Sequence, residues 1–94
     1  MIRITDKHLQ AAVDRLNRIT DSPMAPYSMD EHGKLKANPG NYHIDGAYGG
    51  VKLVRMDNGS GGITNPIYMG FETKRKCYEL IHSYINGIES THGK

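Results

Sequence analysis

Two stretches with the apolar spacing of a helix, one near each end of the chain, bracket a segment rich in glycine and tyrosine. In the first stretch, residues 5–20, apolar side chains recur every three or four positions and would share one helix face. Thr5 suits the N-cap position, and Asp14 and Arg18 would pair on the opposite face. The helix should end before Pro23, because the residue preceding a proline avoids helical dihedrals. The predicted apolar face comprises Leu9, Ala12, Val13, Leu16 and Ile19.

The second helical stretch covers residues 73–86 or beyond and carries a broad apolar stripe. Asn86-Gly87 has the composition of a C-cap pair, so we expect the helix to end there. Residues 90–94 would then form a disordered tail. The stripe comprises Cys77, Tyr78, Ile81, Tyr84, Ile85 and Ile88.

The segment between the two helical stretches contains runs that are typical of strands, at residues 41–44 and 51–56. The glycines in residues 46–50 permit positive φ in the connection, and we expect a bulged hairpin there. Residues 63–69 would form a third strand, and Pro66 suits a sheet edge because proline cannot donate to a ladder. Both faces of the second run carry apolar side chains, which indicates that both are partly covered.

A short exposed hairpin is the further β element that the sequence predicts. Residues 27–29 and 34–36 flank a turn at residues 30–33 within a proline-interrupted loop. Residues 1–94 are therefore expected to form a single α+β domain. We predict a small antiparallel sheet of two to four strands, flanked by an N-terminal and a C-terminal helix that lie on one face, in the order α-β-β-β-α.

The composition limits how much of the chain can be buried. Apolar residues make up 37% of the 94 residues, which is below the roughly 45–50% of typical domains, a range that includes glycine. Such a chain can gain burial by dimerising or by binding a partner, so a homodimer is one expectation. The net charge of +2 neither supports nor excludes nucleic-acid binding.

The expected location of the protein is the cytoplasm. The single cysteine, Cys77, allows no internal disulfide, which fits a reducing compartment. No stretch approaches the roughly 20 apolar residues that span a bilayer, and the N-terminus lacks the apolar core of a signal peptide. We therefore expect no association with a membrane.

Catalytic and metal-binding patterns are absent from the sequence. The five histidines show no metal-ligand spacing, and no serine or cysteine lies in an activating context. The glycine-rich turn lacks the G-x-x-x-x-G-K pattern of a phosphate-binding loop. His43 is interpreted as a strand histidine held by a hydrogen bond. The sequence thus predicts a protein that is not an enzyme and that needs no cofactor or metal.

Three consecutive cations, Lys74, Arg75 and Lys76, begin the second helical stretch. The helix macrodipole disfavours cations at this end by a few tenths of a kcal/mol each, which favours a site for a negatively charged partner. The alternative is a solvated charged face, with Glu72 and Glu79 as local partners.

Tyrosine is unusually common, with six tyrosines against one phenylalanine. Tyr78 and Tyr84 belong to the predicted helix core, whereas Tyr27, Tyr42, Tyr48 and Tyr68 fall in loops or strands. Exposed tyrosines offer a large contact area at low entropy cost, although a core tyrosine with a solvated hydroxyl explains many of them. The candidate partner-binding residues are Lys74, Arg75, Lys76, Tyr42, Tyr48 and Arg55.

Most of the chain resembles a family of small accessory proteins encoded by tailed bacteriophages and prophages. The resemblance is carried by residues 16–20, 22–27 and 40–53, with Arg55-Met56 and Gly61-Gly62. It supplies no catalytic residues. It implies a non-catalytic protein that binds and inhibits a host protein or protein–nucleic acid machine, with host defence systems such as CRISPR–Cas among the targets.

A second resemblance, of element order, is to the double-stranded RNA-binding domain. That domain also runs helix, three strands, helix, and a lysine-rich start of its second helix contacts phosphates. The resemblance implies a nucleic-acid-binding module with direct nucleic-acid contact. A third hypothesis is a sponge that holds a small anionic signal between the glycine-rich turn, the tyrosines and the basic residues.

Overall fold

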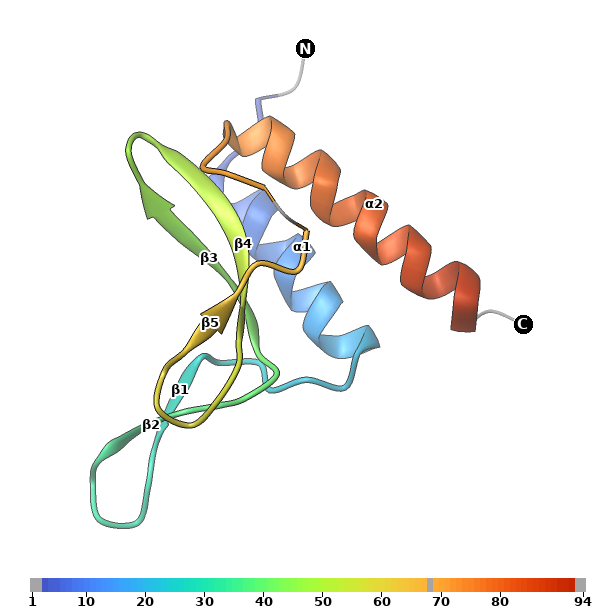
Figure 1. Cartoon of the computed structure of the whole chain (residues 1–94). Helices are drawn as coiled ribbons and strands as arrows, with labels where there is room; N and C mark the ends of the chain where they lie inside the picture. Colours follow the sequence, from blue (N-terminus) through green and yellow to red (C-terminus); the bar gives the residue numbers. More distant parts are fainter. Residues whose placement is uncertain (1–2, 68, 93–94) are drawn as a thin grey trace.

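A computed structural model describes residues 3–67 and 69–92 (Figure 1). The predicted α+β fold with a helix at each end is confirmed, and the strands form two antiparallel sheets, β1-β2 and β3-β4-β5. The elements are α1 (Asp6–Ile19), β1 (Tyr27–Met29), β2 (Leu35–Ala37), β3 (Tyr42–Ala47), β4 (Gly50–Met56), β5 (Ile63–Thr64) and α2 (Lys74–His92).

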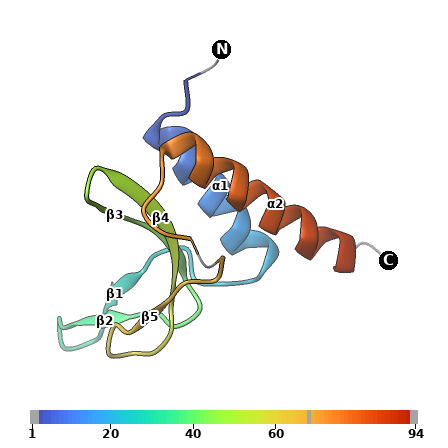
Figure 2. The ribbon, with the colours of Figure 1, turned by 45° about the horizontal axis from the view of Figure 1, so that its top comes forward.

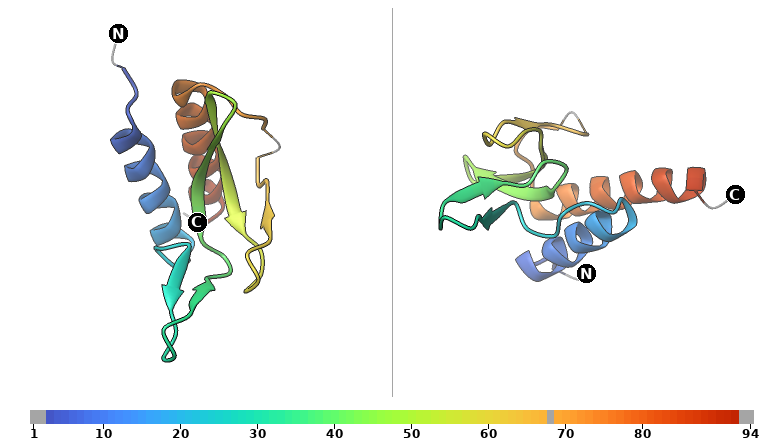
Figure 3. Two further views of the ribbon diagram at one scale, coloured as in Figure 1. Left: turned by 90° about the vertical axis from the view of Figure 1, so that its left-hand side faces the viewer. Right: turned by 90° about the horizontal axis from the view of Figure 1, so that it is seen from below.

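The two helices lie side by side on one face of the β3–β4 pair and run in the same direction (Figures 1 and 2). Their first turns therefore lie at the same end of the molecule, close to the turn between β3 and β4. The β1–β2 hairpin projects from the opposite end (Figure 3).

The core lies between the helices and the inner face of β3 and β4. Tyr42 and Leu53 face the helices, and the predicted apolar faces of α1 and α2 meet them there. On β4 both Leu53 and its neighbour Val54 are fully buried, so both sheet faces are covered, as the mixed pattern predicted. The buried cluster contains Leu9, Ala12, Val13, Leu16, Tyr42, Leu53, Met69, Cys77, Ile81 and Ile85.

A buried asparagine holds α1 against the sheet. The backbone N–H of Tyr42 donates to Asn17 Oδ1 at 2.9 Å, and Asn17 Nδ2 donates to the Tyr42 carbonyl at 3.0 Å. The Asn17 side chain thus makes the pair of hydrogen bonds with β3 that a neighbouring strand would make. It satisfies both the N–H and the carbonyl of Tyr42. Asn17 is 0% exposed.

The first helix begins and ends near its predicted limits. Thr5 is the N-cap, and the His8 side chain completes a capping box by accepting from the Thr5 backbone N–H. The predicted ion pair between Asp14 and Arg18 was wrong, because Asp14 accepts a hydrogen bond from Gln10 at 2.9 Å.

The predicted C-cap at Asn86-Gly87 was also wrong. α2 continues through Asn86 and Gly87 to His92, so residues 90–92, which were expected in a disordered tail, are helical. Residues 93–94 lie outside the described residues. Gly87 does not adopt the positive φ that a glycine cap would require. The hydroxyls of Ser90 and Thr91 donate to its carbonyl, in the last turns of the helix.

The connection between β3 and β4 is tighter than predicted. The register runs unbroken from Tyr42 opposite Arg55 to Ala47 opposite Gly50, so the expected bulge was wrong. Only Tyr48 and Gly49 form the turn, with φ of 53° and 73°. Positive φ at both central residues is the signature of the type I′ turns that match the twist of a hairpin.

The remaining strands are short. The exposed hairpin predicted at residues 27–29 and 34–36 is present, with β2 displaced by one residue, and Met29 pairs with Leu35. The predicted third strand is shorter than expected: β5 ends at Thr64, before Pro66, and pairs with β4 at the sheet edge. Residue 68 of that prediction lies outside the described residues.

Candidate partner-binding surface at the hairpin tip

An exposed aromatic side chain occupies the turn between β3 and β4. Tyr48 is 95% exposed, and its ring meets the ring of Phe71 edge-on at a centroid distance of 5.5 Å. The other close contact of Phe71 is cationic, because the Lys52 Nζ lies 4.6 Å from its ring centroid. A tyrosine, a phenylalanine and a lysine thus form one small patch at the tip of the hairpin.

The tip is fixed to the start of α2 by backbone contacts. Val51 and Glu72 exchange two hydrogen bonds of 2.8 Å, one in each direction. Gly50 lies so close to this bridge that a Cβ atom on it would be 3.0 Å from the Glu72 carbonyl oxygen. The close approach brings Phe71 to Tyr48 and holds the first turn of α2 beside the hairpin.

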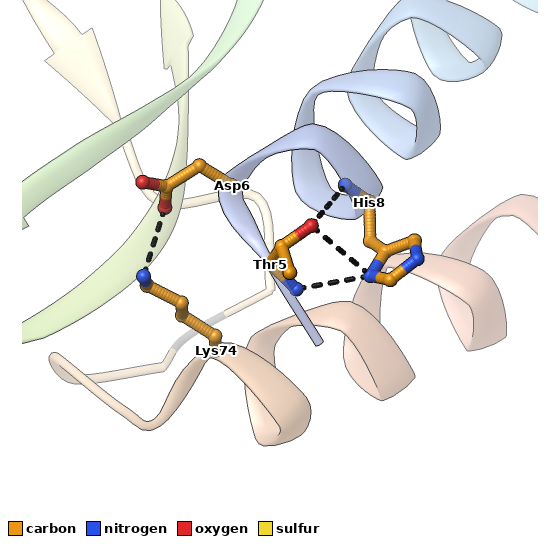
Figure 4. Close-up of polar contacts among 4 residues, drawn as sticks. All are labelled: Thr5, Asp6, His8 and Lys74. Atoms are coloured by element: carbon orange, nitrogen blue, oxygen red, sulfur yellow. Dashed lines mark hydrogen bonds and ion pairs between the residues drawn. The ribbon is translucent and has the colours of Figure 1, made fainter. Parts of the chain in front are cut away.

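The three predicted cations lie at that first turn. Lys74 forms an ion pair of 3.2 Å with Asp6 of α1, rather than with Glu72 or Glu79 (Figure 4). Thr73 is the N-cap, since its hydroxyl accepts from the Lys76 backbone N–H at 3.1 Å. Lys76 is exposed and Arg75 is half-buried. Asp6 and the Thr73 cap offset part of the unfavourable interaction between the cations and the helix dipole.

The other two candidate residues lie elsewhere. Tyr42 and Arg55 pair across β3 and β4, about 17 Å from the turn if each residue adds roughly 3.3 Å. The Arg55 guanidinium lies 5.8 Å from the Tyr42 ring centroid, and the Tyr42 hydroxyl meets that of Tyr84 at 3.2 Å. Burial and this hydroxyl pair raise the pKa of Tyr42 to about 12. Tyr42 is 6% exposed and so offers a partner little surface.

Sequence reasoning missed two members of the tip patch, Phe71 and Lys52. Lys52 could have been noticed, because the alternation of residues 51–56 places it on the strand face opposite to Leu53. In the structure it pairs with Asp45, on the face away from the helices. Phe71 is the only phenylalanine, and it directly precedes the segment that begins α2. No sequence pattern links these two residues to Tyr48. Only the folded structure brings them together.

Burial favours the neutral forms of two further titratable side chains, Cys77 and His43. Burial raises the pKa of the Cys77 thiol to about 11, so it is a poor nucleophile at neutral pH. Burial lowers the pKa of His43, partly opposed by Asp45, and its Nδ1 lies 3.1 Å from Asn41 Oδ1, as a held strand histidine requires. Within residues 3–67 and 69–92, no three His, Cys, Asp or Glu side chains gather closely enough to hold a metal ion.

Comparisons with protein-family models, with curated proteins and with solved structures found no match to this chain. In the part of the chain that the structure describes, neither helix combines the length and the apolar character needed to cross a membrane. The geometry of the hairpin tip is therefore the basis for the functional argument.

Proposed function

We propose that this protein is a phage-encoded, non-catalytic accessory protein that binds and inhibits a host protein machine. The protein binds through the surface at the tip of the β3–β4 hairpin. The main support for this proposal is the backbone conformation and the exposure of Tyr48. The phage origin and the host target, for example a defence system such as CRISPR–Cas, rest on the resemblance of residues 40–53 to phage accessory proteins. The hairpin-tip surface is defined as Tyr48, Lys52, Phe71, Lys74, Arg75 and Lys76.

In the free protein, a tyrosine at position 48 is conformationally unfavourable. Its φ of 53° lies in the left-handed region, which costs an ordinary L-residue about 1–2 kcal/mol and which asparagine or glycine occupies more cheaply. The ring recovers little of this cost by burial, because 95% of the residue is exposed. Backbone strain and exposed tyrosines both concentrate at binding sites, so a partner that covers the ring explains both features.

The charges around Tyr48 indicate the chemistry of the partner. Lys52 lies over the Phe71 ring, Lys74 and Lys76 lie in the adjoining first turn of α2, and the described ion pairs give only Lys74 a carboxylate partner among these three. A complementary protein would place an acidic rim around a pocket for the tyrosine ring. Such a contact blocks the partner by occupying its surface and requires no chemistry from this chain.

Replacing Tyr48 by asparagine separates binding from stability. Tyr48→Asn should leave the free energy of unfolding unchanged or raise it by about 1 kcal/mol, because asparagine tolerates positive φ. The variant should capture the host partner at least tenfold less tightly and fail to inhibit its activity. Tyr27→Asn, which removes another exposed tyrosine far from the tip, should bind normally. Unchanged inhibition by Tyr48→Asn would place the functional surface elsewhere.

A charge variant distinguishes a protein partner from nucleic acid. Lys74→Gln combined with Arg75→Gln and Lys76→Gln should remain folded and should weaken inhibition by the purified protein. Capture from host lysate should survive nuclease treatment if the partner is a protein. Capture that disappears with nuclease, with affinity for duplex RNA that falls steeply with salt, would instead favour the nucleic-acid-binding module.

A further inference from the structure

A cleft of about 230 Å³ opens between α1 and α2, and its lining shares no residue with the hairpin-tip surface. We propose that this interhelical cleft binds the phosphate group of a small ligand. The proposal does not depend on the function proposed above. The cleft is lined by His8, Ala11, Ala12, Arg15, Arg18, Tyr78 and His82.

The residues of α1 that line the cleft form one stripe along the helix. They recur at three- and four-residue steps from position 8 to position 18, which places them on a common face. Ala11 and Ala12 leave the floor of the cleft open because their side chains are short. Arg15 and Arg18 are one turn apart, and both line the cleft with long cationic side chains.

Three rings stand beside the alanine floor. The rings of His8 and Tyr78 are 6.3 Å apart between centroids, and those of Tyr78 and His82 are 4.4 Å apart. The rings join the two helices and give the cleft an aromatic wall. A planar group attached to a phosphate could lie against this wall.

The capping box fixes the proton of His8. The Thr5 backbone N–H donates to His8 Nδ1 at 2.9 Å, so Nδ1 is the acceptor and the proton of the neutral ring lies on Nε2 (Figure 4). Nε2–H is then a hydrogen-bond donor. The contact that caps α1 therefore also leaves His8, which lines the cleft, with an Nε2–H donor.

The lining carries donors but no carboxylate. Arg15 pairs with Glu89 at 2.7 Å, but both side chains are more than 40% exposed, so this pair contributes little and can be shared with a bound anion. Arg18 has no side-chain ion pair or hydrogen bond within residues 3–67 and 69–92. It lies in the last turn of α1, where the dipole favours a cation but supplies no counter-ion.

The arrangement of the cations favours a tetrahedral oxyanion such as phosphate over chloride or a carboxylate. Like charges one turn apart repel by a few tenths of a kcal/mol on a helix, and an anion between them reverses that effect. Guanidinium groups bind phosphate oxygens through paired N–H donors. Lining donors come from both helices, and a tetrahedral group presents several oxygens to them, whereas a carboxylate offers only two.

Titration of the intact protein with inorganic phosphate and with adenosine monophosphate tests the proposal. Phosphate should shift the NMR signals of His8 and His82 saturably and raise the melting temperature, and chloride at equal ionic strength should do neither. Arg15→Gln with Arg18→Gln should weaken binding at least tenfold. Lys34→Gln with Lys36→Gln, on the β1–β2 hairpin, removes equal charge and should bind as the wild type does.

The two probes distinguish the source of the phosphate group. Tighter binding of adenosine monophosphate would assign the ring wall to a nucleoside, and equal binding would assign the cleft to phosphate alone. Shifts that do not saturate, or equal affinity in the double arginine variant and the lysine control, would overturn the proposal. The inhibition assay with Tyr48→Asn is unaffected by either outcome.

Discussion

Asn17 shows how one polar side chain can set the position of a helix. Its amide pairs with both the N–H and the carbonyl of Tyr42, and the residue is fully buried. The apolar stripe of α1 defines which face meets the sheet, and this pair of hydrogen bonds defines where along β3 it rests. Hydrophobic contacts are non-directional and could not specify that position alone.

Replacing Asn17 by alanine should destabilise the protein by about 2–4 kcal/mol, since two buried backbone groups would lose their partners. Denaturant unfolding gives the free-energy difference. Asn86→Ala is the matched control, because Asn86 is an exposed helical asparagine and its replacement should change stability by less than about 0.5 kcal/mol. Equal effects of the two variants would contradict the assigned role of Asn17.

His43 makes the stability of the protein depend on pH. Burial lowers its pKa in the folded state below the ordinary 6.5, so the unfolded chain binds more protons under mildly acidic conditions. The contribution is complete above about pH 6.5 and is lost as the pH falls below that value. The free energy of unfolding should therefore decrease between about pH 7 and pH 5. His43→Gln should flatten this slope, and His32→Gln, at an exposed turn residue, should retain it.

At the scale of elements, apolar periodicity predicted the helices and the main strand pair well. It placed Cys77 and Leu16 in the core, because helix and strand spacing record which face is buried. Of the glycines expected to permit positive φ in the hairpin connection, Gly49 adopts it and Gly46 and Gly50 do not. Periodicity failed where a single residue determines where a helix ends or which type of turn forms. Gly87 has the identity of a cap residue but continues α2, and no sequence spacing reveals that Tyr48 rather than a bulge forms the turn.

The candidate surface was only partly predictable for the same reason. The cations at residues 74–76 were recognised from the sequence, because the start of the second helix and the charges there can both be predicted. Phe71 and Lys52 join Tyr48 only through the bridge between Val51 and Glu72, which links segments with no shared pattern. Tyrosine counts alone could not separate the buried Tyr42 from the exposed Tyr48.

The contact between the hairpin and the start of α2 should be sensitive to one methyl group. In Gly50→Ala the new Cβ would lie 3.0 Å from backbone atoms of Phe71 and Glu72, which cannot move without breaking the bridge. We expect a loss of about 1–3 kcal/mol in the free energy of unfolding. Gly70→Ala is the control, because a Cβ there meets no atom within 4 Å and φ is not positive. If both variants unfold alike, the close approach has no energetic importance.

The whole molecule is less compact than its length allows. Its radius of gyration is 13.9 Å, whereas a compact domain of this size has about 12 Å. The projecting β1–β2 hairpin contributes to the difference (Figure 3). Its cross-strand pair Met29 and Leu35 is 69% and 72% exposed. Exposed apolar side chains on a short two-stranded hairpin gain little in an isolated monomer.

We predict that this hairpin supports self-association. Sedimentation should show a concentration-dependent increase in mass, and Met29→Ser with Leu35→Ser should weaken the association without lowering the melting temperature, because both side chains are exposed. Ser28→Ala with Lys36→Ala changes neighbouring positions of the same strands and should associate normally. A wild-type protein that remains monomeric at high concentration would refute the prediction.

The shared direction of α1 and α2 has a consequence for how quickly a partner arrives (Figure 1). In an antiparallel pair the fields of two helices cancel, but here both positive ends lie beside the hairpin tip and add to the lysines there. An acidic partner would be drawn towards that end before any contact forms. The association rate constant should accordingly fall as salt is added, while the dissociation rate constant stays nearly constant, which stopped-flow mixing at two ionic strengths can measure.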